Sequence, residues 1–227
     1  KRAEERLLFD YQKGLAELFG LVDTPENLAV EQLMQDFFRS AAVLLRINDR
    51  LLQRFEEHLA VDQIIVPIND SYVLKNGYLL ALDNRFSSMG LEAVFELLSV
   101  WRTQFECKGL HSDTARGLSE SLHQIKPYAQ QSERVRASFM ALLLEDNGVV
   151  HLQRLARLGI LARYLPEFSQ VTGRMQYDLF HVYTVDQHTL NVLDFMRRFE
   201  QGKQDGFSLP HEVFPRLRKR HLIWLAG

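Results

Sequence analysis

Cysteine is scarce in this sequence, and long apolar runs are missing from it. The 227 residues contain a single cysteine, Cys107, which excludes an intramolecular disulfide framework and fits a reducing compartment. No uninterrupted apolar run approaches the ~18 to 20 residues that span a bilayer, and the charged start KRAEER is not a signal peptide. The formal net charge of −2 gives no electrostatic reason to expect a polyanion. We therefore expect a cytoplasmic protein that binds neither membranes nor nucleic acid.

The motifs that commonly carry catalysis are missing as well. The sequence has no G-x-x-x-x-G-K phosphate loop, no G-x-G-x-x-G turn, no H-E-x-x-H pair and no D-x-D. None of the eight histidines is followed by Asp, and Cys107 has no Cys or His partner at metal-ligand spacing, so we interpret it as packing. The adjacent acids Glu56-Glu57 and Glu145-Asp146 fall on predicted helix surfaces, where neighbouring side chains point about 100° apart. They are poor candidates for a shared metal.

Helical periodicity dominates what is present. At 46% hydrophobic and 25% charged residues the composition is ordinary for a globular protein. Apolar spacing predicts an amphipathic helix over residues 5–19, ended by Gly20. A turn from Thr24 to Asn27 then leads into a much longer helix that reaches about Leu59. At ~1.5 Å per residue it would run to about 45 Å, long enough for the spine of a bundle. We expect its polar residues to form a solvated face.

A β-hairpin interrupts this helical pattern. The dipeptide Asn76-Gly77 separates the apolar runs Tyr72 to Lys75 and Tyr78 to Ala81, and both of its residues tolerate the positive φ of a type I′ turn. Ile64 to Val66, which precedes Pro67, is β-branched but too short to predict a helix. We predict a small hairpin near residues 72–81 that acts as local scaffolding; a partner-contacting edge is the alternative.

After the hairpin the helical period returns and then breaks. Further helices are predicted from Leu91 to Trp101, over 114–125 after the caps Ser112-Asp113, over 133–145 after the cap Ser132, and over 149–158 before Gly159. The run from Tyr164 to Phe168 contains a proline and disrupts the pattern, so we place a domain boundary near residues 165–175. A polar loop with Gly202 and Gly206 then precedes a last predicted helix from Pro215 to Ala226. The predicted fold class is mainly α, a helical bundle with one small hairpin.

The stretch from Tyr177 to Met196 looks most like the beginning of a chemical site. Thr184 and Gln187 form a T-x-x-Q capping box, so a helix is predicted to start at Val185. On that helix His188 recurs at helical spacing with Val192, Phe195 and Phe199, which predicts an inward-pointing imidazole. Such a histidine can be a metal ligand or a core residue satisfied by a backbone carbonyl, and the residues alone leave both readings open. His181 precedes the predicted cap, and its direction is not predicted.

A family resemblance bears on that choice. The run DQHTLNVL around His188 resembles the segment that opens the HD phosphohydrolase domain of bacterial bifunctional uridylyltransferase/uridylyl-removing enzymes, which modify the nitrogen regulatory protein PII. The resemblance extends to NLAVEQLMQDFF at residues 27–38, to Asn69-Asp70 with NGYL at 76–79, to residues 159–168, and to DLFHVYTVD at 178–186. In such domains a first histidine is followed by a His-Asp pair and a further Asp. This chain stops before any such pair.

The resemblance implies a fold, an activity and a set of ligands. Residues 1–168 would be the helical domain that follows the nucleotidyltransferase domain, and residues 169–227 the truncated N-terminal part of an HD-type all-α domain. The parent enzyme would transfer UMP from UTP to PII and remove it again in response to glutamine, using Mg²⁺ or Mn²⁺. His188 would be the first metal-ligating histidine of the HD site. We expect the chain itself to be an inactive fragment without either complete active site, to which no ion binds tightly.

Two other functions stay open at this point. The chain could be a non-catalytic helical interaction module, in which His188 is packed and the hairpin or the long helix binds a protein. It could also be the helical domain of the adenylyltransferase of glutamine synthetase, against which the HD-like run around His188 argues.

Overall fold

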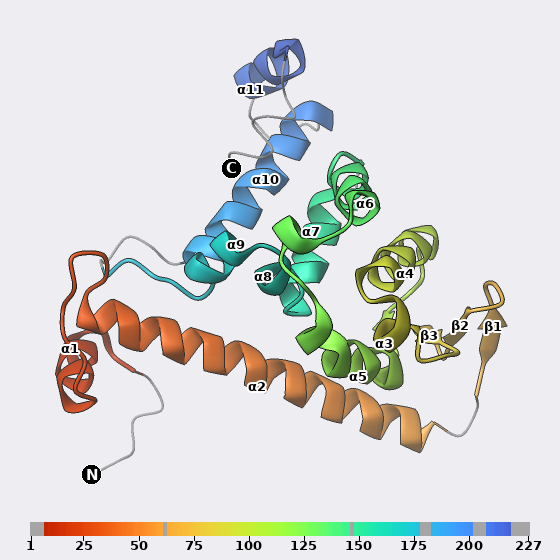
Figure 1. Cartoon of the computed structure of the whole chain (residues 1–227), viewed down its shortest axis with the longest axis horizontal. Coiled ribbons are helices and arrows are strands. Elements are labelled where there is room, and N and C mark those ends of the chain that lie inside the picture. Colours follow the sequence, from red (N-terminus) through yellow and green to blue (C-terminus); the bar gives the residue numbers. More distant parts are fainter. Residues whose placement is uncertain (1–6, 61–62, 146–147, 178–182, 202–207, 219–227) are drawn as a thin grey trace.

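The protein is mainly α-helical, with one small sheet at one end. The computed structural model describes residues 7–60, 63–145, 148–177, 183–201 and 208–218, and within them it contains eleven α-helices and one four-stranded sheet. Figure 1 shows one long helix, α2, along one side of the molecule, with the sheet and most other helices on the other side of it. The predicted fold class is confirmed. Among the described helices, none is long and apolar enough to cross a membrane.

The first two helices form a pair. Helix α1 (Phe9–Leu18) is followed by Gly20 at φ 72°, and α2 (Ala29–Leu59) runs for 31 residues, as the periodicity predicted. The start of α2 is fixed by the Asp23 carboxylate, which accepts a hydrogen bond of 2.7 Å from the Ala29 N–H. Helix α1 packs against the first turns of α2, where Ala16, Ala29 and Val30 form a small buried cluster.

Much of the polar face of α2 is solvated as predicted, for example at Asp49 and Glu56, but part of it meets the rest of the chain, and Gln35 is buried. Gln35 donates 2.8 and 3.1 Å hydrogen bonds to the carbonyls of residues 170 and 172, and Arg39 donates to the carbonyls of residues 169 and 172 at 2.8 and 3.0 Å. These carbonyls lie at the C-terminal end of α9 (Pro166–Val171), where carbonyl groups have no partner within the helix. The helix therefore contacts the rest of the chain through side-chain donors.

The sheet is built around the predicted hairpin. Strands β2 (Tyr72–Lys75) and β3 (Tyr78–Ala81) pair antiparallel across Asn76 and Gly77, at φ 52° and 85°, which confirms the type I′ signal. Two further strands were not predicted. Strand β1 (Ile65–Pro67) pairs antiparallel with β2, and the two-residue β4 (Gly109–Leu110) pairs parallel with β3. The strand order is β1-β2-β3-β4.

The main core lies between the sheet and a set of short helices. These are α3 (Arg85–Met89), α4 (Leu91–Thr103), α5 (Ser112–Ser121), α6 (Glu133–Leu143), α7 (Gly148–Arg157), α8 (Leu161–Tyr164) and α9, with the 3₁₀ turns η1 (Leu122–Gln124) and η2 (Tyr128–Gln130). At its centre the rings of Phe139 and Tyr164 lie 4.8 Å apart, with Phe95 and Tyr128 against Tyr164. Burial raises the pKa of Tyr164 to about 12.

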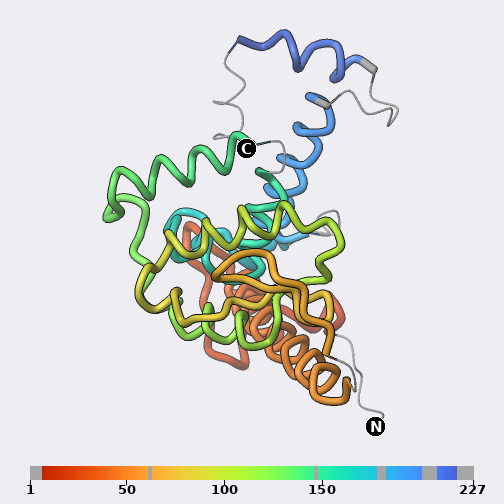
Figure 2. Tube along the Cα trace, turned by 90° about the vertical axis from the view of Figure 1, so that its right-hand side faces the viewer, coloured from red at the N-terminus to blue at the C-terminus, as the bar shows by residue number. Residues whose placement is uncertain are grey.

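The last helices extend away from this core. Helix α10 (Val185–Gln201) contacts α7 and α9 near its start and continues outward to α11 (Ser208–Val213) and the turn η3 (Phe214–Arg216), as Figures 1 and 2 show. Helix α11 was not predicted. Of the helix predicted from Pro215 to Ala226, the described part contains only η3 and two residues without helical structure, and residues from 219 on lie outside the described residues. The predicted domain boundary at residue 168 stays a prediction.

Candidate functional site

The helix that carries His188 begins where the sequence predicted, at Val185. Its first turn is held by two contacts with the preceding loop. The Val185 N–H donates a 2.8 Å hydrogen bond to the carbonyl of Arg174, and the Asp186 carboxylate accepts a 3.0 Å bond from the N–H of Gly173. An acidic residue in a first helical turn also interacts favourably with the helix dipole. The start of α10 is therefore well anchored.

His188 itself points away from the core, so the predicted inward direction was wrong. The core-facing stripe of α10 is made by Leu190 and Leu193, which are 7% and 5% exposed, and His188 and Phe195 are exposed. Helix α10 carries two apolar stripes, and periodicity alone does not say which of them meets the core. The exposed imidazole has no ring hydrogen bond or ion pair with another described residue.

The described residues do not complete a metal site around His188. No group of three His, Cys, Asp or Glu side chains in the described part of the chain is placed to hold an ion. Asp194, on the same helix, forms ion pairs with Arg197 at 3.0 Å and Arg198 at 2.7 Å. His181 lies outside the described residues. One imidazole is too few for a divalent ion, which takes four or more ligands, so no reaction step can be built on these residues alone.

A buried polar cluster joins the end of α2 to the start of α5. The Glu57 carboxylate accepts hydrogen bonds from the backbone N–H of Ser112 at 3.0 Å, from the Ser112 hydroxyl, and from the Gln53 amide at 2.8 Å. The Nε2 atom of His111 lies 3.4 Å from the same carboxylate. Gln53 also donates to the Leu110 carbonyl at 2.5 Å. The cluster thus fastens the long helix to β4 and α5.

This cluster is a structural junction and not a nucleophilic site. Because the Nδ1 atom of His111 accepts the backbone N–H of Asp113 at 3.2 Å, the ring proton sits on Nε2, which lies near Glu57 without forming a hydrogen bond to it. The Ser112 hydroxyl donates to the carboxylate and not to the imidazole, so no base is placed to activate it. Burial lowers the pKa of His111, although Glu57 and Asp113 oppose that shift. The ring is therefore neutral near pH 7.

Sequence reasoning missed this junction. It predicted Ser112-Asp113 as the cap of α5, whereas the cap is His111, whose ring nitrogen serves as acceptor. It also assigned Glu57 to a helix surface, and the Glu57 side chain is only 10% exposed. The motif of a histidine followed by Ser-Asp at a helix start was a usable signal for the cap. Nothing local in the sequence indicates that Glu57 meets it, since the two lie more than fifty residues apart.

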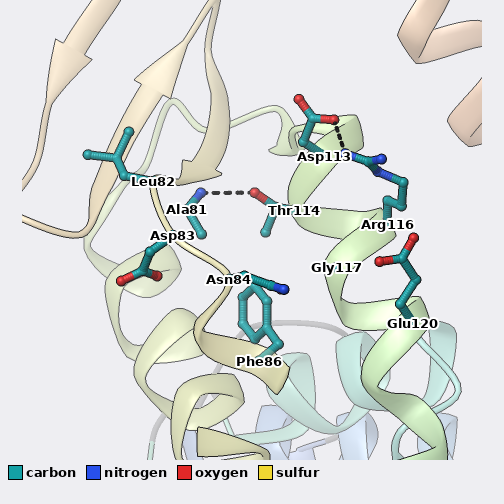
Figure 3. A pocket seen from close by; sticks show the side chains of 10 residues that line it. All are labelled: Ala81, Leu82, Asp83, Asn84, Phe86, Asp113, Thr114, Arg116, Gly117 and Glu120. Atoms are coloured by element: carbon teal, nitrogen blue, oxygen red, sulfur yellow. Dashed lines mark hydrogen bonds and ion pairs between the residues drawn. The ribbon is translucent and has the colours of Figure 1, made fainter. Parts of the chain in front are cut away.

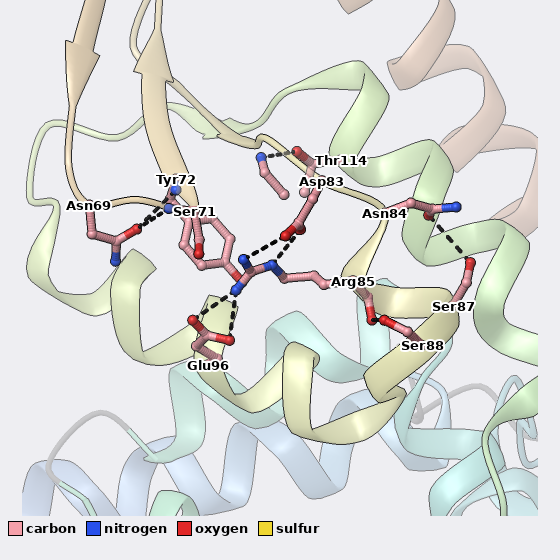
Figure 4. Close-up of polar contacts among 11 residues, drawn as sticks. Asn69, Ser71, Tyr72, Asp83, Asn84, Arg85, Ser87, Ser88, Glu96 and Thr114 are labelled. Carbon is pink, nitrogen blue, oxygen red and sulfur yellow. Dashed lines mark hydrogen bonds and ion pairs between the residues drawn. The ribbon is translucent and has the colours of Figure 1, made fainter.

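A second polar network surrounds Arg85 on α3. Its guanidinium binds Asp83 at 2.6 Å and Glu96 at 2.9 Å and lies over the ring of Tyr72 at 4.8 Å, as drawn in Figure 4. The Asn69 side chain in the same view accepts the backbone N–H groups that open β2. The network holds the loop after β3 against α4, because the buried guanidinium has a carboxylate on each side.

A shallow pocket of about 270 Å³ lies between the β3–α3 loop and α5 (Figure 3). Most of its polar side chains already have partners, and the exposed Glu120 carboxylate has none among the described residues. Asp113 and Arg116 form an ion pair at 2.9 Å, Asp83 is bound by Arg85, and the Thr114 hydroxyl accepts the Ala81 N–H at 2.9 Å. Because no nucleophile is hydrogen-bonded to Glu120 in the described part of the chain, the pocket offers no acid–nucleophile pair poised for chemistry.

Comparison with known proteins supplies what the geometry does not. The family model described as "Uridylyltransferase GlnD third domain" matches residues 72–164, from β2 to the end of α8. The model described as "GlnD PII-uridylyltransferase" matches residues 1–52, which include α1 and most of α2. No solved structure shows a significant match.

Curated relatives match over the whole chain. The bifunctional uridylyltransferase/uridylyl-removing enzymes of Xanthomonas axonopodis pv. citri (strain 306) and Xanthomonas campestris pv. campestris (strain B100) are each 50% identical to it over 227 residues. The enzyme of the same name from Pseudomonas aeruginosa (strain LESB58) is 38% identical over 231 residues. Each match covers 100% of this chain and 26% of the relative, so the chain spans about a quarter of the length of these relatives. Because the two family models together span more than half of the chain and the identity extends over all of it, the chain belongs to the family of GlnD bifunctional uridylyltransferase/uridylyl-removing enzymes.

Proposed function

We propose that the chain is the central scaffold of a cytoplasmic enzyme that transfers UMP from UTP to PII and hydrolyses it off again in response to glutamine. The observation that carries this proposal is the 50% identity to enzymes of both activities over the full length of the chain. The polar contacts of α2 give the scaffold its physical form: most of this helix lies in the region matched by the uridylyltransferase model, and its last turns bond to the third domain at Ser112. PII is the protein partner.

We further propose that His188 is one ligand of the Mg²⁺ or Mn²⁺ ion used for uridylyl removal. Its imidazole is exposed on an anchored helix, and packing against the core does not use it. An imidazole with a free nitrogen is a common ligand for such ions as Mn²⁺, whereas Mg²⁺ prefers oxygen. The remaining ligands would come from the His-Asp pair and the further Asp that the family resemblance implies.

The 227-residue chain is accordingly proposed to be catalytically silent. Phosphodiester hydrolysis assisted by an ion needs the ion held in a fixed geometry by several ligands, and uridylyl transfer needs carboxylates that hold nucleotide phosphates. The described residues offer one imidazole for the first task, and the sequence has no D-x-D pair for the second.

The test is a split between two activities in the intact enzyme. His188→Ala should lower the rate of UMP release from uridylylated PII at least a hundredfold and leave UMP transfer to PII within a factor of three of wild type. His123→Ala is the matched control, because His123 is also exposed and makes only one ring contact, with the carbonyl of Glu120 at 2.7 Å. Equal loss of both activities, or undiminished release, would contradict the assignment of His188. Release of UMP by the 227-residue chain alone would contradict its proposed silence.

A further inference from the structure

The most unusual surface of this chain is the outer side of α2. Nine large apolar side chains between Phe37 and the end of the helix are exposed, and the fraction is 66% for Leu44 and 76% for Leu59. These residues are Phe37, Val43, Leu44, Leu45, Ile47, Leu51, Leu52, Phe55 and Leu59. Single exposed apolar residues are normal, but a contiguous apolar surface on one helix marks a place of interaction.

The exposed side chains continue a stripe that is covered elsewhere. Val30, Phe37, Leu44 and Leu51 follow one another at intervals of seven residues, so they lie along the same side of the helix. At Val30 that side is buried against α1, where the exposed fraction is 4%. From Phe37 onward no described residue covers it. We call the side from Phe37 to Leu59 the outer stripe.

The opposite side of α2 is already in use. Gln35, Arg39, Gln53 and Glu57 recur at spacings of four, fourteen and four, and all of them bond to the later part of the chain. Figure 1 shows the sheet and the short helices on this side of α2, and Figure 2 shows the same helix at the margin of the molecule. The outer stripe therefore cannot turn inward unless these bonds are broken.

These bonds also argue against a membrane as the occupant. A helix that lies in a membrane interface keeps its polar face in water and carries many Lys and Arg residues there. On α2, part of the polar face, at Gln35, Gln53 and Glu57, is instead packed against protein. A helix with polar contacts on one side and an apolar stripe on the other is typical of an element between two protein units.

We infer that the outer stripe packs against the rest of the uridylyltransferase unit within the same polypeptide of the intact enzyme. The model of the PII-uridylyltransferase matches α1 and α2 as far as Leu52, and the third-domain model begins only at Tyr72. The inner side of α2 bonds to the third-domain match at Leu110 and Ser112, while most of the helix belongs to the uridylyltransferase match, so its outer side is free for the rest of that unit. About three quarters of the relatives' length lies outside this chain, so the intact enzyme has enough polypeptide to cover the stripe. The inference rests on family membership and goes beyond the proposed activities.

Thiol accessibility in the intact enzyme tests this contact. Leu44→Cys and Asn48→Cys place a thiol on the outer stripe, and Asn48→Cys removes no apolar contact, so it remains informative if Leu44→Cys disturbs folding. Ser119→Cys is the control, since Ser119 is exposed on α5. For each position, peptide mass spectrometry measures the rate at which maleimide labels the introduced cysteine. The labelling rate in the intact enzyme is then divided by the labelling rate in the 227-residue chain. We expect this ratio of labelling rates to be about 0.1 or less at both stripe positions and to stay the same when the enzyme is diluted tenfold. Labelling of Ser119→Cys shows that the reagent is active.

Two results would overturn the inference. A ratio near one at both stripe positions would mean that the stripe is solvated in the intact enzyme. Protection that disappears on dilution together with a dimer seen in size-exclusion chromatography would make a second copy the occupant. The activity split of His188→Ala does not depend on either result, so failure here is distinguishable from failure of the proposed function.

Discussion

Removal of the Glu57 carboxylate should weaken the attachment of the long helix to the third-domain region. The carboxylate accepts two hydrogen bonds from Ser112 and one from Gln53 in a setting where its side chain is 10% exposed. Hydrogen bonds to a charged acceptor contribute about 1.5 to 3 kcal/mol each to stability. In the alanine variant, water molecules can accept some of the hydrogen bonds that Glu57 accepted, so the net loss is smaller than the sum of the three. We therefore expect Glu57→Ala to lower the free energy of unfolding by about 3 kcal/mol.

Urea unfolding of the chain, followed by circular dichroism, measures this loss. Asp49→Ala is the matched control, because Asp49 is an exposed acid on the same helix and its replacement should change stability by less than about 0.5 kcal/mol. Glu57→Gln should lie between the two variants, since one amide oxygen still accepts a hydrogen bond. If Glu57→Ala unfolds at the same urea concentration and with the same slope as Asp49→Ala, the junction does not fasten α2.

Two further predictions concern the core and a helix cap. Burial, aided by Arg154 and Arg102, lowers the pKa of His151 to about 4, whereas an unfolded histidine titrates near 6.5. The folded state therefore resists protonation of this ring more than the unfolded state does. The free energy of unfolding should be highest above pH 6.5 and fall by about 3 kcal/mol as pH falls towards 4. Urea midpoints at pH 7 and pH 4.5 should differ less for His151→Phe than for wild type, and an equal difference would refute the assignment. Ser132 caps α6 by accepting the Val135 N–H at 3.3 Å, so Ser132→Ala should cost about 1 kcal/mol and Ser132→Asp should restore stability in the same urea assay. Full stability of the alanine variant would show that the cap is dispensable.

Local signals predicted the elements well where one short motif determines the backbone. Asn76-Gly77 predicted the hairpin because few other residues adopt two successive positive φ values. Thr184 and Gln187 placed the start of α10, and Ser132 the start of α6. Strands β1 and β4 were missed because three and two residues are too short to show an alternation, and both form only by pairing with the hairpin.

Direction was harder to predict than position. The apolar pattern of α2 located the helix correctly but did not say which segments its faces would meet. Beyond Phe37 the structure leaves large apolar side chains such as Leu44 exposed, while Arg39 and Gln53 on the other side of the helix donate to backbone carbonyls of distant segments. The same difficulty explains why the direction of His188 was predicted wrongly. Helix α10 has two apolar stripes, and the one with Leu190 and Leu193 packs against the core. Periodicity identifies the faces of a helix, and tertiary contacts decide which face is covered.

Metal affinity of the intact enzyme tests the central claim most directly, which is that this chain contributes one ligand to an ion site completed by other residues. Mn²⁺ binding would be titrated by electron paramagnetic resonance for wild type, His188→Ala and the control His123→Ala, and for the 227-residue chain. The account predicts that His188→Ala weakens the Mn²⁺ affinity of the intact enzyme at least tenfold and that His123→Ala leaves it unchanged. In the 227-residue chain alone, wild type and His188→Ala should bind Mn²⁺ equally weakly. Equal Mn²⁺ affinity of wild-type and His188→Ala intact enzymes would contradict it and leave His188 an ordinary surface residue.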